Sequence, residues 1–293
     1  MAAVARRRLQ ALDVRALVVK TGPGKLSAQL RCAYAWALDR GYEGIVTIDG
    51  NDKDDPDTIP AFVQALRDGV DVKPDDIYAH VSAGGSLPQT AAVNLADYVR
   101  AFTELSKKND FVIHVCISLD FSCCYQNAKL AAADFDNVYV VDSRNLSTGH
   151  GLVVLEAERM AREGMAPDDI VAALHDLTGR VEASFILDRL DYMKKGGRCS
   201  AVTLLGANLL RLRPCIEVRD GKMGVGKKYR GSFDKCVCEY ITDKIGNRSD
   251  LELRRVFITH SGVPEETVQK AVETVQKLQP FEEICVTRAG CTV

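Results

Sequence analysis

Short apolar runs that suit β-strands alternate along this chain with longer patterns that suit α-helices. The strand-like runs contain β-branched residues and have polar ends, and they cover residues 44–50, 110–118, 137–143, 183–188, 254–261 and 283–290. Parallel strands need long crossover connections, and a helix is the usual one. The alternation therefore predicts an α/β fold with parallel strand pairs.

Three of the intervening segments carry clear helix boundaries. The run "GLVVLEAERMAREG" ends at Gly164, a residue type favoured just beyond a helix C-terminus. The run "APDDIVAALHDLTGR" has Pro167 near its first helical position, followed by two aspartates that suit the positive end of a helix. The run "VPEETVQKAVETVQKL" repeats this order of proline and acidic residues. We expect a helix over each of the three.

The segment "CIEVRDGKMGVGKKYRG" interrupts the alternation. Two strand-like runs flank Asp220 and Gly221, a pair that favours the tight turn of a β-hairpin. An antiparallel element is therefore expected in the second half of the chain, and the change of pattern falls near Gly179. We predict a first α/β lobe with a parallel sheet over residues 72–180 and a second α/β lobe, containing the hairpin, from residue 181.

The composition fits a globular protein with two ordinary domains. The chain has 293 residues, of which 46% are apolar and 27% charged, and its formal net charge is −2. This charge does not favour nucleic-acid binding, and no apolar run approaches the roughly 20 residues that span a bilayer. The basic start "MAAVARRRLQALDVRALVVK" lacks the apolar core of a secretory signal. We expect a cytoplasmic protein with neither a nucleic-acid partner nor a membrane span.

The ten cysteines do not form a metal-binding or disulfide pattern. Cys116, Cys215 and Cys285 lie inside apolar runs, as buried reduced thiols do. The clusters "CC" at 123–124 and "CVC" at 236–238 lack the two-residue gap of zinc knuckles. We expect no metal ion and no cofactor.

An acidic cluster follows the first strand-like run. Asp49 and Asn51 leave the end of "GIVTID", and oxygen ligands two residues apart at such a point can hold a divalent cation and a diphosphate. Taken alone, the cluster favours a solvated, turn-rich loop. The "GPGK" upstream is not a phosphate-binding P-loop, because Val19 stands where the first glycine is needed.

The segments "GKLSAQLRCAYAWA", "GIVTIDGND" and "DDPDTIPAFVQAL" together resemble family-2 glycosyltransferases of the dolichol-phosphate-mannose-synthase type, over about residues 14–70. The resemblance implies a partial GT-A-type α/β segment in which Asp49 and Asn51 are the vestige of a metal and sugar-nucleotide site. Many members carry Asp where this chain has Asn51. The base-binding strand and the acceptor half have no counterpart here, so we expect this segment to be inactive. A protein related to transferases that use a nucleotide-sugar donor is the alternative function.

From Val72 onward five segments resemble, in order, the DegV family of bacterial fatty-acid-binding proteins. They are "GGSLPQTAAVN", "ISLDFSCCYQNA", "VYVVDSRNLSTGHG", "LDYMKKGGRCS" and "LLRLRPCIEVRDGKMGVGKKYRG". Thr90 stands at the threonine of the first motif and Ser122 at the central serine of the second. Leu119, Cys123 and Cys124 depart from the commonest residues of the serine loop.

The resemblance implies a two-lobed α/β fold with a long-chain fatty acid between the lobes, presented to a partner fatty acid kinase. Thr90 and Ser122 would bind the carboxylate through their hydroxyls, and the chain would be a lipid-binding module, not an enzyme. Ser122 also precedes the helical run "CCYQNAKLAAA", where a carboxylate would meet backbone N–H groups. The alternative from the residues alone is a helix-capping serine and a loop hydroxyl.

Three further residues carry separate expectations. Arg198 follows two glycines in "KKGG", and Arg230 ends the hairpin in "KKYRG". The resemblance places both near the carboxylate end, facing an anion or the partner, although either is otherwise an ordinary solvated charge. His114, inside "FVIHVCIS", is interpreted as a strand histidine with its hydrogen bonds satisfied.

The stretch "LRDGVDVKPDD" satisfies both resemblances at once, which predicts a fusion within residues 67–71. We therefore divide the chain into a glycosyltransferase-like segment over 1–71, a first DegV-like lobe over 72–180 and a second over 181–293. The family's opening strand has no counterpart after the junction, and its closing strand, whose histidine completes the carboxylate site, would follow "AGCTV". We expect the first lobe to be short at both ends.

Overall fold

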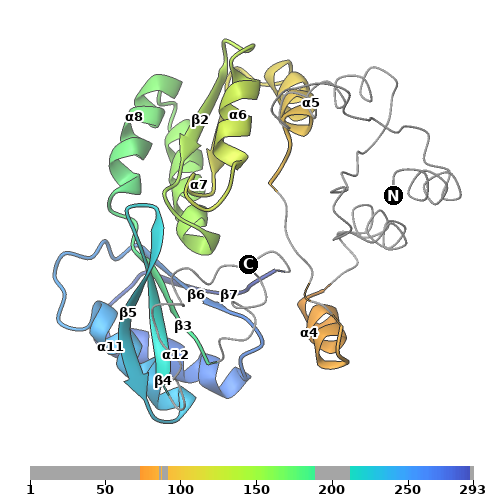
Figure 1. The fold of residues 1–293 in the computed structure, drawn as a ribbon. Helices are drawn as coiled ribbons and strands as arrows, with labels where there is room; N and C mark the ends of the chain where they lie inside the picture. The colour runs from red at the N-terminus through yellow and green to blue at the C-terminus, as the bar shows by residue number, and fades with distance from the viewer. Residues whose placement is uncertain (1–72, 86, 88–91, 189–211, 291–293) are drawn as a thin grey trace, which may run out of the picture. The chain divides into compact units, whose positions relative to one another are not determined.

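The structure is a computed structural model, and it describes residues 73–85, 87, 92–188 and 212–290. The chain divides into two compact units, Met1–Val72 and Lys73–Val293. All described residues belong to the second unit, whose elements are labelled in Figure 1. The strand expected over 44–50 and the glycosyltransferase-like segment lie outside the described residues.

One parallel strand pair is covered by helices on both faces. Strand β1 (Val112–Cys116) pairs in register with β2 (Val138–Asp142). Helices α5 (Leu95–Ser106) and α6 (Cys124–Ala132) cover one face, and α7 (Ser147–Arg162) and α8 (Pro167–Thr178) cover the other. Because successive side chains of a strand point to opposite faces, Cys116 packs towards α5 and α6 while Val115 packs towards α7 and α8.

An antiparallel sheet follows in the chain. Strands β3 (Ala183–Ile186), β4 (Leu212–Arg219) and β5 (Lys222–Arg230) lie in that order. The turn between β4 and β5 is formed by Asp220 and Gly221, with φ of 51° and 79°. Positive φ at both central residues is what a type I′ hairpin turn needs, so the predicted hairpin is confirmed.

A second parallel pair closes the described chain. Strand β6 (Arg255–His260) pairs with β7 (Glu283–Arg288), and α12 (Glu265–Leu278) connects them. Helices α11 (Phe233–Ile245) and α12 pack against one face of this pair. The remaining described helix, α4 (Pro74–Ser82), contains no buried residue. It is joined to the end of the β6–β7 pair by contacts between Asp75 and Arg288 and between Tyr78 and Ser261.

The element positions confirm most of the sequence-based predictions for this part of the chain. All five strand-like runs downstream of residue 100 contain a strand, and α8 begins with Pro167, Asp168 and Asp169 as expected. Helix α12 follows Pro264 with two glutamates in its first turn. Helix α7 starts at Ser147, four residues before the predicted run, and ends before Gly164, whose φ is +81°.

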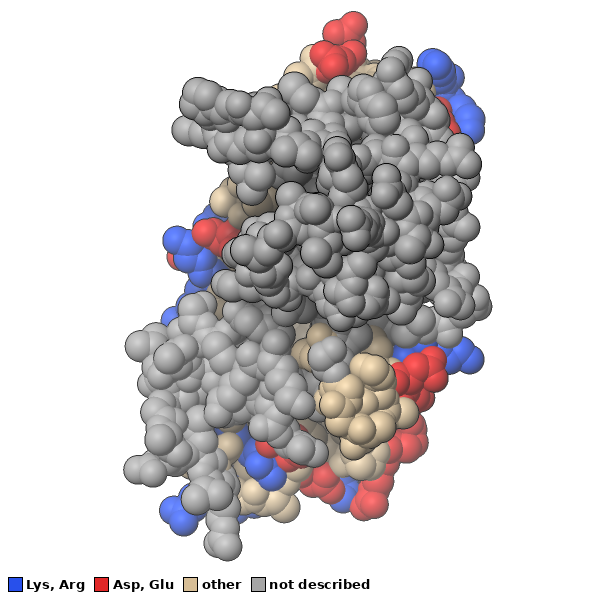
Figure 2. Space-filling model, turned by 45° about the vertical axis from the view of Figure 1, so that its right-hand side comes forward, with Lys and Arg blue, Asp and Glu red and all other residues tan. Residues whose placement is uncertain are grey.

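The described surface carries both signs of charge. Figure 2 shows acidic and basic side chains beside one another along the margins of one face. Many form ion pairs, such as Arg159 with Glu163 at 2.7 Å at the C-terminal end of α7. Exposed pairs of this kind contribute about 0–1 kcal/mol each, so the fold depends mainly on its apolar clusters. Among the described helices, none is long and apolar enough to cross a membrane.

Candidate functional site

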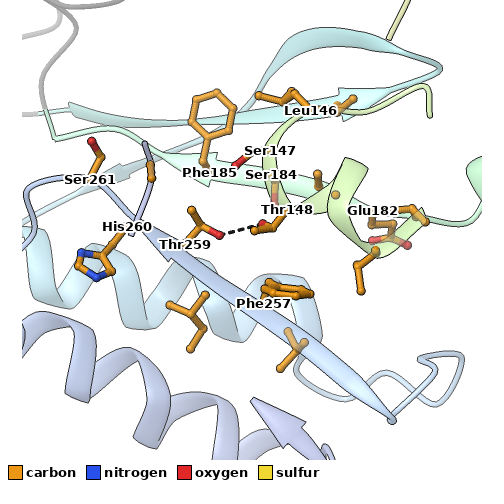
Figure 3. A pocket seen from close by; sticks show the side chains of 18 of the residues that line it. Leu146, Ser147, Thr148, Glu182, Ser184, Phe185, Phe257, Thr259, His260 and Ser261 are labelled. Atoms are coloured by element: carbon orange, nitrogen blue, oxygen red, sulfur yellow. Dashed lines mark hydrogen bonds between the residues drawn. The ribbon is translucent and has the colours of Figure 1, made fainter. Parts of the chain in front are cut away.

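A cavity of about 2600 Å³ lies among the described elements, and its wall is mainly apolar. Its lining includes the loop before α6, the first turn of α7, strands β3 and β6, and side chains of α11 and α12. Figure 3 shows Leu146, Phe185 and Phe257 around one part of it. Ligand pockets for drug-sized molecules are typically about 300–1,000 Å³, so this cavity has room for a long acyl chain.

Ser122 lines this cavity and is half-buried. Its hydroxyl donates to Cys124 Sγ at 3.1 Å and accepts from the backbone N–H of Cys124 at 3.3 Å. Helix α6 begins at Cys124, and its N-cap residue, Cys123, makes no side-chain cap hydrogen bond. The first turn of a helix leaves backbone N–H groups without intrahelical partners, so an anion beside Ser122 would meet donors there. Ser122 therefore satisfies one of these donors, as the capping alternative expects, and still faces the cavity.

The loop that carries Ser122 is held by the tip of the β4–β5 hairpin. Ser118 is fully buried, and its hydroxyl donates to the carbonyl oxygen of Gly221 at 2.7 Å. The same hydroxyl accepts from the backbone N–H of Asp120 at 3.3 Å. On the other side of the tip, Arg144 donates to Asp220 at 2.8 Å. The hairpin thus fixes a loop four residues upstream of Ser122.

A positive charge from the hairpin also reaches the cavity. Lys222 and Met223, the first residues of β5, line it, and Lys222 Nζ lies 3.9 Å from the carboxylate of Asp120. The Lys222 side chain is 72% exposed, so it can move toward an anion without losing a buried contact.

The first turn of α7 forms a second polar part of the wall. Ser147 and Thr148 line the cavity, and Thr148 Oγ1 lies 2.8 Å from Thr259 Oγ1 on β6. Figure 3 draws this hydrogen bond as a dashed line. Thr259 Oγ1 is in turn 3.0 Å from Thr287 Oγ1 on β7. These hydroxyls form a short hydrogen-bonded row that joins α7 to the β6–β7 pair.

The buried segment before α7 explains how that helix is placed. Asn145 is 1% exposed, and its side chain donates to the carbonyl oxygen of Val181 at 3.1 Å and accepts from the backbone N–H of Leu146. Ser143, also buried, donates to the Asn145 carbonyl oxygen at 3.2 Å. This is the "VVDSRNLS" segment singled out in the sequence, and its polar side chains fix the chain path into the cavity wall.

The interpretation of His114 as a satisfied strand histidine is only half right. It lies on β1, but its Nε2 is buried and has no hydrogen-bond partner among the described residues. The ring contacts Tyr98 and Phe102 edge-on, with centroids 5.2 and 5.6 Å away. Burial, with a smaller contribution from the charge of His150, lowers the pKa of His114 and keeps the ring neutral. The Tyr98 and Phe102 rings of α5 pack against the imidazole in place of a hydrogen-bond partner.

Two other histidines lie close to the cavity. His150, in the first turn of α7, contacts the carbonyl oxygen of Val115 through Nε2 at 3.1 Å, and burial lowers its pKa. His260, at the end of β6, lines the cavity, and its Nδ1 is buried without a partner among the described residues.

The remaining predicted site residues are placed as follows. Thr90, Arg198, Asp49 and Asn51 lie outside the described residues. Arg230 is exposed at the end of β5 opposite to the hairpin tip, and is not among the described residues that line the cavity. Because a strand advances about 3.3 Å per residue, the eight steps from Lys222 place Arg230 roughly 26 Å from the tip. The structure therefore brings Ser122 to the cavity but not Arg230.

Sequence reasoning missed several residues of the wall. Lys222 was part of a recognised hairpin, but the pattern did not indicate which loop the tip would contact. Thr148 and Thr259 have no local signal, because they meet only after the α7 and β6 segments come together. No group of three or more His, Cys, Asp or Glu side chains within the described ranges could hold a metal ion.

These features define an α/β protein in which residues of both parallel and antiparallel strands line a mainly apolar cavity. A family model described as "Uncharacterised protein, DegV family" matches residues 63–293, and the chain belongs to the DegV family. The match begins at residue 63, before the start at 72 that we predicted.

Several relatives agree with this assignment. A DegV domain-containing protein of Caldanaerobacter subterraneus is 30% identical over 241 residues, which cover 81% of this chain and 85% of the relative. A fatty-acid-binding DegV-family protein of Thermus thermophilus has a solved structure that matches with a TM-score of 0.69 and 27% identity, over 75% of this chain and 79% of that one. DegV of Bacillus subtilis, a fatty-acid-binding protein, has the same fold, with a TM-score of 0.62 and 24% identity over 76% and 79% of the two chains.

The comparisons confirm the DegV resemblance and the α/β fold class. They do not support the glycosyltransferase resemblance over residues 14–70: the proteins named above are all of the DegV family, and the family match already includes the last residues of that segment. The acidic residues of "GIVTIDGND" are common at the end of any strand followed by a polar turn, so the motif was weak on physical grounds.

Proposed function

We propose that this protein binds a long-chain fatty acid, with the carboxylate at Ser122 and the hydrocarbon tail in the apolar cavity. The observation that carries the proposal is the half-buried hydroxyl of Ser122, which opens onto that cavity beside the first turn of α6. The fatty-acid-binding relatives from Thermus thermophilus and Bacillus subtilis support it. The protein is a binding module, and we propose no reaction for the chain itself.

The energetics divide between the two ends of such a ligand. A hydrogen bond from Ser122 to a carboxylate is charge-assisted and contributes about 1.5–3 kcal/mol. Each buried CH₂ of the tail contributes about 0.8 kcal/mol, so the tail dominates the affinity while the hydroxyl fixes the orientation. Thr90 supplies the second hydroxyl in this proposal, and Lys222 adds a positive charge near the same end.

A fatty acid kinase is the partner that this function implies, because a bound carboxylate at a cavity mouth can be presented to an enzyme. Arg198 and Arg230 are the proposed partner-facing positions. The exposure of Arg230, at the end of β5 remote from the hairpin tip, supports a contact with another protein and not with the buried lipid.

The test measures palmitate binding by the full chain. Ser122→Ala and Thr90→Ala should each weaken binding roughly ten- to a hundredfold, since about 1.4 kcal/mol corresponds to a factor of ten. Ser122→Thr keeps a hydroxyl and should bind more tightly than Ser122→Ala. The matched control is Ser249→Ala, an exposed serine outside the cavity lining. Equal affinity of Ser122→Ala and the control would contradict the proposed carboxylate site.

The partner contact is tested separately, with the same lipid-loaded protein. Arg230→Glu should leave palmitate affinity unchanged and weaken phosphorylation of the bound acid by a bacterial fatty acid kinase. If Arg230→Glu supports phosphorylation as well as the unmodified chain, Arg230 does not face the partner.

A further inference from the structure

Three thiols gather at the start of α6, beside the proposed carboxylate site. Cys116, at the end of β1, is buried in the cluster formed with α5 and α6. Cys123 and Cys124 are adjacent in the chain, and both line the cavity.

The three thiols differ in accessibility. Burial, together with neighbouring negative groups, raises the pKa of Cys116 to about 12, which keeps it a protonated thiol. Cys124 is partly buried, and its sulfur accepts the hydrogen bond from Ser122. Cys123 is exposed, and among the seven cysteines that the structure describes it is the only exposed one. A soluble thiol reagent that approaches the described surface therefore meets Cys123 first.

We propose that Cys123 is a modification site at which mixed-disulfide formation closes the fatty-acid site. The chemistry is thiol–disulfide exchange with a low-molecular-weight disulfide. The Cys123 thiolate attacks one sulfur of the reagent, a protein–reagent S–S bond forms, and the other half leaves as a thiolate that takes up the proton Cys123 has lost. The reverse exchange with a free thiol restores Cys123, so the modification is reversible.

The geometry explains why an adduct would affect the lipid. Cys123 is the N-cap residue of α6 and the direct neighbour of Ser122, so an adduct on its sulfur occupies the same section of the cavity wall as the proposed carboxylate. A tripeptide adduct such as glutathione also carries carboxylates, and these repel a fatty-acid carboxylate at that end. Asp120, which also lines the cavity there, carries a further negative charge, and among the described residues Lys222 is the basic group paired with it, at 3.9 Å. This inference rests on the proposed function, because the modification of Cys123 would regulate the same site.

The experiment uses the full-length protein and glutathione disulfide. Palmitate affinity is measured before treatment, after treatment and after reduction with dithiothreitol, and mass spectrometry identifies the modified cysteine. We expect treatment to weaken binding at least tenfold and reduction to restore it. We also expect preloaded palmitate to slow the modification of Cys123. For each variant, the palmitate affinity after treatment is divided by the affinity before treatment. This ratio should be near one for Cys123→Ser. For Cys285→Ser it should fall as far as it does for the unmodified chain.

The outcomes separate the two proposals. If the untreated protein binds no palmitate, the proposed function is wrong and the regulation falls with it. If the untreated protein binds palmitate but Cys123 stays unmodified, or its modification leaves the affinity unchanged, only the inference about Cys123 is overturned. An equal loss of binding in Cys123→Ser after treatment would also overturn it, because another thiol would then be responsible.

Discussion

The two parallel strand pairs are alike in register but not in their surroundings. Both faces of β1–β2 are covered by described helices, and Val141 and Ile170 in its core are fully buried. The β6–β7 pair is covered by α11 and α12 on one face, while Phe257 and Thr259 of β6 line the cavity. No residue of β6 or β7 is fully buried.

This difference indicates where a ligand belongs. Parallel sheets occur almost only with both faces covered, and such strands read as nearly continuous apolar runs. The centre of β6, "VFI", is an apolar run of this kind, yet the described residues supply only one covering layer for it. A fatty-acid tail on the Phe257 side would supply the second layer. The β1–β2 pair needs no such contribution, and the stability of the two regions should differ accordingly.

The largest expected effect tests the covered pair. Ile170→Ala, in the α8 side of the β1–β2 core, should lower the free energy of unfolding by about 2–5 kcal/mol, because it leaves a cavity in a closely packed cluster. Urea denaturation without lipid measures this.

The contrasting variant is Phe257→Ala. Without lipid, Phe257→Ala should lower the free energy of unfolding by less than Ile170→Ala does, although it removes more atoms. It should also weaken palmitate binding by roughly tenfold or more, because buried apolar contact with the ligand is lost. A cost in stability larger than that of Ile170→Ala would show that the Phe257 face is already covered in the free protein.

A middle-sized effect is expected at the β4–β5 hairpin tip, which contacts the loop after β1. Gly221 has φ of +79°, and a Cβ there would lie 2.8 Å from Ser118 Oγ. Gly221→Ala should therefore lower the free energy of unfolding by about 1–2 kcal/mol, because a residue with a Cβ is strained in the left-handed conformation. The loss should be larger if the Ser118 hydrogen bond is also broken. The matched control is Gly224→Ala on β5, where a Cβ would meet nothing within 4 Å. Equal thermal stability of the two variants would show that the tip does not hold the loop.

The smallest expected effect is on the pH dependence of the free energy of unfolding. Burial lowers the pKa values of His114 and His150, so the unfolded chain binds protons that the folded chain excludes as the pH falls below about 6.5. Stability should therefore decrease from pH 7 towards pH 5.5.

His114→Phe removes one of these groups. It should reduce the slope of the free energy of unfolding against pH by at most about 1.4 kcal/mol per pH unit, the value for one proton. Urea denaturation at several pH values measures the slope. At pH 7 the variant should stay within about 1 kcal/mol of the unmodified chain, since it also removes an unpartnered nitrogen. The control is His175→Gln at an exposed position of α8. An unchanged slope in His114→Phe would mean that His114 is not buried as described.

Local signals in the sequence were sufficient for most elements. The pair Asp220 and Gly221 predicted the hairpin because only certain residues tolerate positive φ at both turn positions. Pro167 predicted the start of α8 because a proline at the first turn sacrifices no helical hydrogen bond. The start of α7 was missed, since Ser147 adopts φ of +48° and its neighbour Thr148 is a weak helix former, so nothing local indicates a helix there.

The candidate site was predicted only in part, because it is built from contacts between distant segments. Ser122 was identified through the DegV resemblance, because its place before a helix fits a capping serine equally well. The hydrogen bond from Ser118 to Gly221 joins residues 103 positions apart, and no local pattern carries that information. The unsatisfied state of His114 depends in the same way on what α5 places against it. Arg230 was expected near the carboxylate end, facing an anion or the partner, and the length of β5 places it far from the hairpin tip.

The bond between Ser118 and Gly221 has a thermodynamic consequence beyond its own strength. The loop from Ser118 to Ser122 is shared by the hairpin and by the proposed lipid site, so the two are linked equilibria. If a ligand at this loop favours the docked hairpin by a certain coupling free energy, docking of the hairpin must favour ligand binding by the same coupling free energy. Hydrogen exchange at the turn would then slow in proportion to lipid occupancy, which makes the β4–β5 turn a reporter of a site that it does not itself form.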